Sequence, residues 1–162
     1  MADGGASSMI MLITALLISG GASAVLISEW SNAVRVVQTN ERASADRDDV
    51  SVALAGDPAM VAYNNSANTI TLYFLNTGAY DLDTTTYEVL VNGDAPTSSS
   101  ESVLPSGTEW NPGDLLQVVL TNGSWTFLDG EDISVYFVGL SERVAGYTHS
   151  ASTSAEVRLN VV

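Results

Sequence analysis

Carboxylates are the side chains of this sequence most able to do chemistry, and they gather in short polar segments. The groups are Asp46, Asp48 and Asp49; Asp81 and Asp83; and Asp129, Glu131 and Asp132. Paired carboxylates bind calcium or act as general acids and bases. None of these groups has the spacing of a calcium-binding loop, and a chain with 19 acidic residues is expected to carry such groups from composition alone. We predict no metal site and no catalytic carboxylate.

Other side chains with catalytic potential are few. The chain has no cysteine and one histidine, His149. Thiol chemistry, disulfides and metal sites built on several Cys or His ligands are therefore excluded. A Ser-His-Asp triad is formally possible, but the segment around His149, GYTHSASTS, contains no nucleophile motif. We expect a loop or surface histidine in a protein that is not an enzyme and holds no cofactor.

Two segments have the form of N-glycosylation sequons. They are Asn64-Asn65-Ser66 and Asn122-Gly123-Ser124, so Asn64 and Asn122 are possible glycosylation sites. Asn122 is also a predicted turn residue, and a structural role is the competing explanation for its presence.

The first element of the chain is an apolar run, Met9–Ile27 (MIMLITALLISGGASAVLI), that no charge interrupts. A helix needs about 20 residues to cross the hydrocarbon core of a bilayer, so this run is just long enough to span it. A cleaved signal peptide is the alternative, with Ala22-Ser23-Ala24 as the cleavage site. The lack of Lys or Arg before Met9 and the resumption of apolar residues after Ala24 favour an uncleaved membrane anchor.

Small and apolar residues recur at helical spacing within this run and beyond it. Ser19 and Ser23 are four residues apart, as are Gly20 and Ala24, and small residues let membrane helices approach closely. A further apolar stripe follows at spacings of four, three and four. The predicted assembly face, which would make the chain a homo-oligomer, comprises Ser19, Gly20, Ser23, Ala24, Leu26, Trp30, Ala33 and Val37.

We therefore predict one helix from about residue 7 to about residue 43, which at 1.5 Å per residue is about 55 Å long and projects beyond the bilayer. Two alternatives remain open for its surface. The small residues are merely tolerated in a plain anchor, or the outer stripe packs on the chain's own domain.

The remainder reads as short strands between turns, after a polar hinge at Ser44–Asp49. The expected strands are 50–54, 59–63, 68–76, 87–92, 115–121, 124–128, 133–138 and 155–161. Asn122-Gly123 predicts a β-hairpin between the strands on either side of it, and Pro96–Ser102 predicts a flexible loop. Seven to nine strands without a helix favour an immunoglobulin-like β-sandwich. The predicted fold class is thus mainly β, with a long N-terminal transmembrane α-helix over 1–45 and a β-sandwich domain over 46–162.

Charge limits the partners. The five basic residues are all Arg, and the formal net charge is −14. A nucleic-acid partner would need a basic patch, so it is excluded, as is docking to an anionic membrane surface. Molar salt shortens the screening length to about 3 Å and largely removes such self-repulsion. We expect a protein of a salt-loving organism, whose soluble part loses structure when salt is withdrawn.

Three segments resemble the archaellin-like proteins of archaea, which include the archaellum filament subunits and the accessory proteins called G and F. The first is the N-terminal run ASSMIMLITALLISGGASAVLIS leading into a long helix. The second, Thr71–Gly93, is similar to the family's strand–NTG–strand stretch. The third, Trp110–Leu120, resembles its W-x-P-G-x-x-L motif.

The resemblance implies a structural part in archaeal motility. Filament subunits of the family carry Lys or Arg just before their cleavage point, and MADGGASS has neither. This difference favours an anchored accessory protein with a stator-like role, whose extracellular sandwich contacts the cell envelope or S-layer and other archaellum accessory proteins. The alternatives are an archaellin or type IV pilin-like filament subunit, and a membrane-anchored adhesion or carbohydrate-binding module using Trp110, Trp125 and Tyr147.

Overall fold

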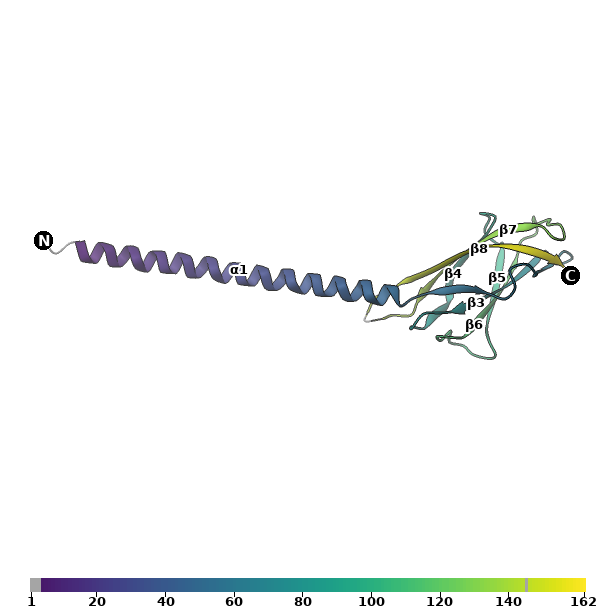
Figure 1. The fold of residues 1–162 in the computed structure, drawn as a ribbon, viewed down its shortest axis with the longest axis horizontal. Coiled ribbons are helices and arrows are strands. Elements are labelled where there is room, and N and C mark those ends of the chain that lie inside the picture. Colours follow the sequence, from purple (N-terminus) through teal and green to yellow (C-terminus); the bar gives the residue numbers. More distant parts are fainter. Residues whose placement is uncertain (1–3, 145) are drawn as a thin grey trace. The chain divides into compact units, whose positions relative to one another are not determined.

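The computed structural model describes residues 4–144 and 146–162, and begins with a single long helix, α1 (Gly4–Asp48) (Figure 1). The helix is longer at both ends than the predicted 7–43. The Ser44–Asp49 segment is not a separate hinge, since α1 runs through it to Asp48. Ala, Arg and Asp are all tolerated in helices, and no Gly or Pro lies between Ser44 and Gly56 to end the helix earlier.

The chain divides into two compact units, Met1–Ser44 and Ala45–Val162. The second unit contains all the described strands. They are β1 (Val52–Ala55), β2 (Val61–Asn64), β3 (Thr69–Asn76), β4 (Leu82–Val91), β5 (Ser98–Leu104), β6 (Leu115–Thr121), β7 (Asp132–Ser141) and β8 (Ser150–Val161).

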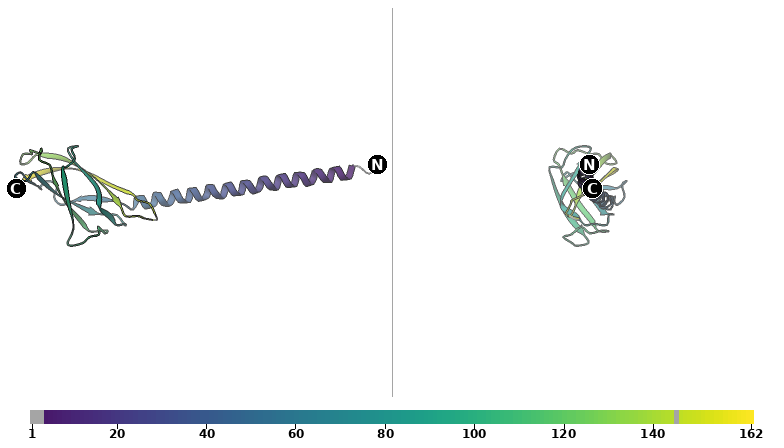
Figure 2. Two further views of the ribbon diagram at one scale, coloured as in Figure 1. Left: turned by 180° about the vertical axis from the view of Figure 1, so that it is seen from behind. Right: turned by 90° about the vertical axis from the view of Figure 1, so that its left-hand side faces the viewer.

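The strands form two sheets that share one strand (Figure 2). In the first sheet β3 pairs with β6 and β6 with β5, while β1 and β2 lie one after the other along the free side of β3. In the second sheet β7 lies between β4 and β8. The end of β8 leaves β7 and pairs in parallel with β2, which joins the sheets. With the β1–β2 pair as strand A, this is the ABED and CFG arrangement of a constant-type immunoglobulin domain.

The sequence therefore predicted the fold class correctly: one long apolar helix followed by an immunoglobulin-like sandwich. Alternation along the strands supplies the core, because inward residues such as Ile70, Leu72 and Phe74 on β3 are fully buried while their neighbours are not. Phe74 and Phe137 meet across the sheets with ring centroids 4.1 Å apart, and Trp110 meets Phe137 edge-on at 6.0 Å. Antibody domains place a disulfide between the same two strands, B and F. In this cysteine-free chain aromatic rings link them.

Two sequence predictions in this region were wrong. Residues 124–128 form no strand, so there is no hairpin across Asn122-Gly123. Both edges of β6 are already occupied by β3 and β5, and residues 122–128 instead cross from one sheet to the other, with Trp125 buried on the way. Pro96–Ser102 is not a flexible loop, since β5 begins at Ser98.

Candidate membrane and assembly interface

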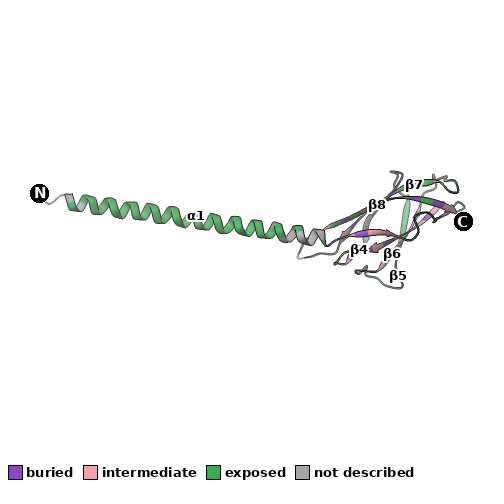
Figure 3. Cartoon of the chain, in the orientation of Figure 1, coloured by how far each residue is buried: buried purple, intermediate pink, exposed green. Residues whose placement is uncertain are grey.

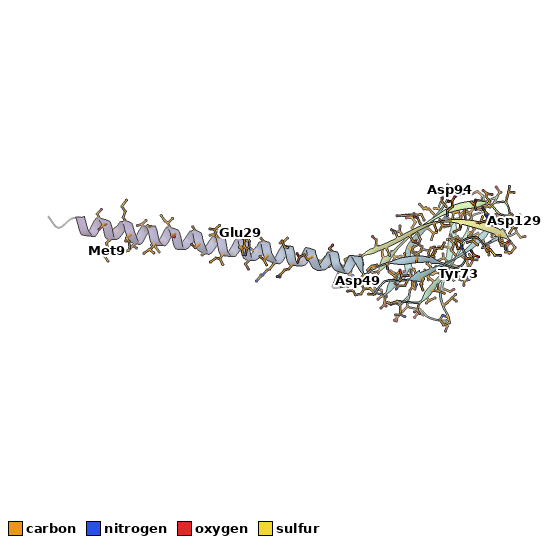
Figure 4. The ribbon with its side chains drawn as sticks, viewed as in Figure 1. Met9, Glu29, Asp49, Tyr73, Asp94 and Asp129 are labelled. Atoms are coloured by element: carbon orange, nitrogen blue, oxygen red, sulfur yellow. The ribbon has the colours of Figure 1, made fainter. Side chains whose placement is uncertain are left out.

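The surface of α1 is apolar and open along most of its length. Ser7–Thr39 has a mean hydropathy of 2.3 in its most apolar window, and none of that window is buried. Figure 3 shows the described residues of the helix as exposed, in contrast to the mixed burial of the strands. Met9 projects from the ribbon in Figure 4 and is 67% exposed. By length and composition this helix is suited to be a membrane anchor or a signal sequence.

Several hydroxyl groups on α1 are satisfied within the helix itself. Thr14 Oγ1 donates to the carbonyl of Ile10 at 2.9 Å, and Ser23 Oγ donates to the carbonyl of Ser19 at 2.8 Å. Beyond the apolar run Thr39 repeats the pattern. A polar group without a partner costs several kcal/mol in hydrocarbon. These internal bonds remove that cost, so the small polar residues are compatible with an apolar environment.

The predicted assembly face separates into two parts on a continuous helix. At 100° per residue, Ser19 and Ser23 share an arc of about 80° with the apolar stripe Leu26, Trp30, Ala33 and Val37. Gly20 and Ala24 lie about 100° to 140° away from Ser19, on a flank of their own. All eight are exposed. Gly20 has open space where a Cβ would stand. The stripe side carries the large groups, and Trp30 is 73% exposed.

In the sandwich, the two motifs of the family resemblance lie together around the side chain of Asn76, which is 1% exposed. Its Nδ2 donates to the carbonyls of Tyr80 at 2.9 Å and Trp110 at 3.0 Å. Its Oδ1 accepts a bond from the Gly78 N–H. The indole of Trp110 donates to the carbonyl of Asp114 at 2.9 Å. The NTG and WNPGD segments are therefore one hydrogen-bonded unit, which we call the Asn76 cluster.

The Asn76 cluster holds the segment that follows α1. The N–H groups of Thr77 and Gly78 both donate to the carbonyl of Ser51 at 3.1 Å, and that of Ala79 donates to the carbonyl of Asp49 at 2.7 Å. A Cβ on Gly78 would lie 2.6 Å from the Asp49 oxygen, so a larger residue cannot fit without moving backbone. The motif thus fixes where the chain joins the sandwich.

The carboxylate groups suspected of chemistry do not converge on a shared site. Among the described residues no three His, Cys, Asp or Glu side chains form a group that could hold a metal ion. Around the 129–132 turn each carboxylate has its own partner. Asp129 accepts from the Val161 N–H, Glu131 from the Leu128 N–H, and Asp132 pairs with Arg158 at 2.8 Å. That pairing lowers the pKa of Asp132.

The other acidic groups are also accounted for. Asp83 accepts hydrogen bonds from the N–H and hydroxyl groups of Thr85 and Thr86, and these bonds, led by that from the Thr85 N–H, lower its pKa. Asp81 and Asp49 belong to no group of side chains that could hold a metal ion among the described residues. The side chains of Asp46 and Asp48 lie outside the described residues.

His149 lies directly before β8, where its backbone N–H donates to the hydroxyl of Ser141. Its ring Nε2 is buried and has no partner among the described residues. Ser141 thus meets the main chain of the histidine, and this contact does not activate the hydroxyl as a nucleophile.

The two sequons differ in structure. The Asn64 side chain is exposed and uses its oxygen to accept from the N–H groups of Ser66 and Ala67. Asn122 is half-buried, and its Nδ2, the atom that glycosylation would modify, donates to the Ala95 carbonyl at 3.1 Å. Asn64 is therefore the more accessible of the two.

The aromatic residues considered for carbohydrate binding do not share a surface. Trp110 is 0% exposed and Trp125 is 4% exposed, while Tyr147 is 59% exposed. Tryptophans at these positions fill the core because each large ring removes much apolar area from water. The prediction that these three residues form one exposed aromatic surface was therefore wrong. The sequence offered only weak support for it, since it does not distinguish a buried tryptophan from an exposed one.

Together, the fold and this surface define a class: a chain with one long exposed apolar helix followed by an independent immunoglobulin-like domain. No protein-family model matches the chain, and no curated protein matches it. Among solved structures, it is similar to the E. coli chaperone DraB, with 19% sequence identity and a TM-score of 0.35. The match covers 69% of this chain and 55% of the chaperone. The chain therefore spans about half the length of that protein, and a likeness this low carries no argument about function.

Proposed function

We propose that this protein is a membrane-anchored structural component of an archaeal cell envelope, with a stator-like accessory role in the archaellum. In this proposal α1 crosses the membrane and packs against other copies of itself. The sandwich is extracellular, contacts the S-layer or other archaellum accessory proteins, and has no catalytic role. The proposal of this particular machine rests on the NTG and WNPGD motifs and on the order of helix and sandwich.

One observation carries the anchoring and assembly part of the proposal. The window of α1 that is apolar enough to span has none of its surface buried within the chain, although the hydroxyls of Thr14 and Ser23 are satisfied internally. Water cannot stabilise such a surface, so lipid or other protein must cover it. The Asn76 cluster supports the same reading, since it fixes a folded domain directly after the helix.

Intact-mass analysis of the native cell tests the role. Sheared filaments and washed envelope are analysed separately for this protein. Full-length protein in the envelope alone is expected for an anchored accessory protein. A shortened form, trimmed before the apolar run and present in filaments, would instead make it a filament subunit and overturn the accessory role.

Helix substitutions test the assembly part. Ser23→Leu places a large side chain on the stripe side, where we expect close packing, and Gly20→Leu does so on the neighbouring flank. Gly21→Leu is the control for the stripe side, because Gly21 lies about 160° from Ser23 and also faces open space. We expect assembly and motility to fall with Ser23→Leu and with Gly20→Leu, and to persist with Gly21→Leu. Full motility with Ser23→Leu and Gly20→Leu combined would refute assembly through this face.

A further inference from the structure

The outer face of the first sheet carries no charged residue. Pairing between strands fixes which side chains point outward, since Ile70, Leu72 and Phe74 lie opposite buried partners on β6 and the residues between them face away. The outward residues, which we call the β3–β6 face, are Ala53, Ala55, Ala62, Asn64, Thr69, Thr71, Tyr73, Leu75, Ser98, Ser100, Ser102, Leu104, Leu115, Gln117, Val119 and Thr121. This face extends across β1, β2, β3, β5 and β6.

The charge of the domain lies elsewhere. The outer face of the second sheet carries four exposed charged residues, Glu88 on β4, Asp132 on β7, and Glu156 and Arg158 on β8. On β1, β2, β3, β5 and β6 the one carboxylate is Glu101, at an inward position, where it accepts a hydrogen bond from Tyr87. In a chain of net charge −14, a whole sheet face without a carboxylate is a distinct surface.

The centre of the β3–β6 face is ordered by a row of neutral hydrogen bonds. Gln117 Nε2 donates to the hydroxyl of Tyr73 at 3.2 Å, and Ser102 Oγ donates to Gln117 Oε1 at 3.1 Å. Tyr73 is labelled on β3 in Figure 4. Val119 and Leu115 add apolar side chains beside this row, and both are half-buried by their neighbours. The result is an uncharged surface with a hollow beside β1 and β2, where Ala55, Ala62 and Tyr73 line a pocket.

Charge and area together identify what fits this face. Two copies of so acidic a protein repel wherever carboxylates meet, so an uncharged face lets two copies approach without that cost. Four strand positions at about 4.8 Å and seven residues at about 3.4 Å give roughly 20 by 24 Å on each copy. Two such faces bury about 1,000 Å², the lower limit for a specific interface.

We propose that the β3–β6 face is a contact between sandwich domains of two copies of this chain. A contact near the lower size limit is weak by itself. Copies already held together through α1 have an effective concentration in the millimolar range, which makes a weak second contact sufficient. In this respect the inference rests on the proposed assembly through the helix.

The absence of cysteine from the sequence gives a clean test. Single cysteines are introduced one at a time into the full chain in its native membrane, in molar salt, and treated with a short bis-maleimide. Val119→Cys and Thr71→Cys lie on the β3–β6 face and are cross-strand partners. Ser152→Cys, on the outer face of the second sheet, is the control. We expect covalent dimers at least several-fold more abundant for Val119→Cys or Thr71→Cys than for Ser152→Cys.

A fourth variant, Ala33→Cys on α1, separates this inference from the proposed assembly. Dimers from Ala33→Cys but from neither Val119→Cys nor Thr71→Cys would overturn the sheet contact and leave the helix assembly standing. No dimers from any variant would overturn both. Equal dimer yields for Ser152→Cys and the face variants would indicate random collision and would overturn the inference, as would capture of a different protein. Native tryptophan fluorescence confirms that each variant is folded.

Discussion

Asn76 and Gly78 are the residues where the structure gives the family-like motif a physical role. Asn76 supplies two N–H donors to the main-chain carbonyls of Tyr80 and Trp110, and Gly78 leaves room for the chain that follows α1. The sequence pattern NTG identified the segment as notable. It could not reveal the role, because the carbonyls of Trp110 and Ser51 come from segments distant in sequence.

Gly78→Ala should destabilise the sandwich. The added Cβ would lie 2.6 Å from the Asp49 oxygen and 2.8 Å from the Ser51 nitrogen, both backbone atoms that cannot rotate away. Overpacking of this kind costs about 1–3 kcal/mol. Urea unfolding of the two proteins measures it. Gly123→Ala makes the same change where nothing lies within 4 Å, and a loss as large there would show that the effect is not steric.

Asp83 should make a pH-dependent contribution to stability. Its folded pKa lies below the ordinary value because Thr85 and Thr86 donate to it. A depressed carboxyl pKa stabilises the folded state above the unfolded value of about 3.9, and the contribution is lost as pH falls through the folded pKa. Asp83→Asn should therefore lower stability at pH 7 and lower it less near pH 3.

Urea unfolding at the two pH values measures the difference. Asp94→Asn is the control, since it makes the same charge change at a side chain without a hydrogen bond to a described residue. An equal loss at both pH values for Asp83→Asn would mean that its carboxylate has no linked role.

At the scale of elements, patterns that depend on neighbours along the chain were predicted best. The β6 strand has the predicted bounds, because LLQVVLT alternates and both its edges are covered. The β5 strand was missed because SSSESVL lacks the apolar alternation of a strand and has one buried residue, Val103. It forms because β6 offers a complete hydrogen-bonding edge, which is a tertiary effect invisible to local propensity. The hairpin predicted after β6 was wrong for a related reason. Both edges of β6 are already paired, with β3 and β5, so no edge is left for residues 124–128.

The aromatic link between the sheets should be the strongest element-to-element contact in the core. Phe137 on β7 meets Phe74, Tyr87 and Trp110 and is fully buried. Phe137→Ala should cost about 3–5 kcal/mol, and Phe137→Leu, which keeps much of the volume, should cost less. Tyr136→Ala is the matched control on the same strand, since Tyr136 faces outward and is 45% exposed.

Chemical denaturation followed by tryptophan fluorescence compares these variants. A net stability of about 5–15 kcal/mol is typical of a domain. Where the Phe137→Ala protein does not fold, Phe137→Leu provides the comparison. A loss for Tyr136→Ala equal to that for Phe137→Leu would contradict a link centred on Phe137.

At the scale of the whole molecule, the balance of charge determines the conditions in which the sandwich is stable. Among residues with described side chains, Arg158 and Asp132 form the one ion pair, and both are exposed, so it contributes little. Nineteen acidic residues against five arginines leave the rest of the charge uncompensated. The sequence predicted this imbalance completely. It could not predict that the β3–β6 face carries no charged residue, because the register of the strands decides which side chains face outward.

Salt should therefore stabilise this protein. Uncompensated carboxylates repel in the folded domain and separate when it unfolds, and the screening length falls from about 10 Å at 0.1 M salt to about 3 Å at 1 M. We expect the sandwich to lose structure as salt is withdrawn and its melting temperature to rise steadily toward molar salt. Circular dichroism from molar to millimolar sodium chloride measures this. A neutral osmolyte at equal osmolarity separates screening from preferential exclusion. A spectrum unchanged across the whole range would mean that the carboxylates are spaced widely enough to tolerate dilute buffer, and the adaptation to high salt inferred from composition would be wrong.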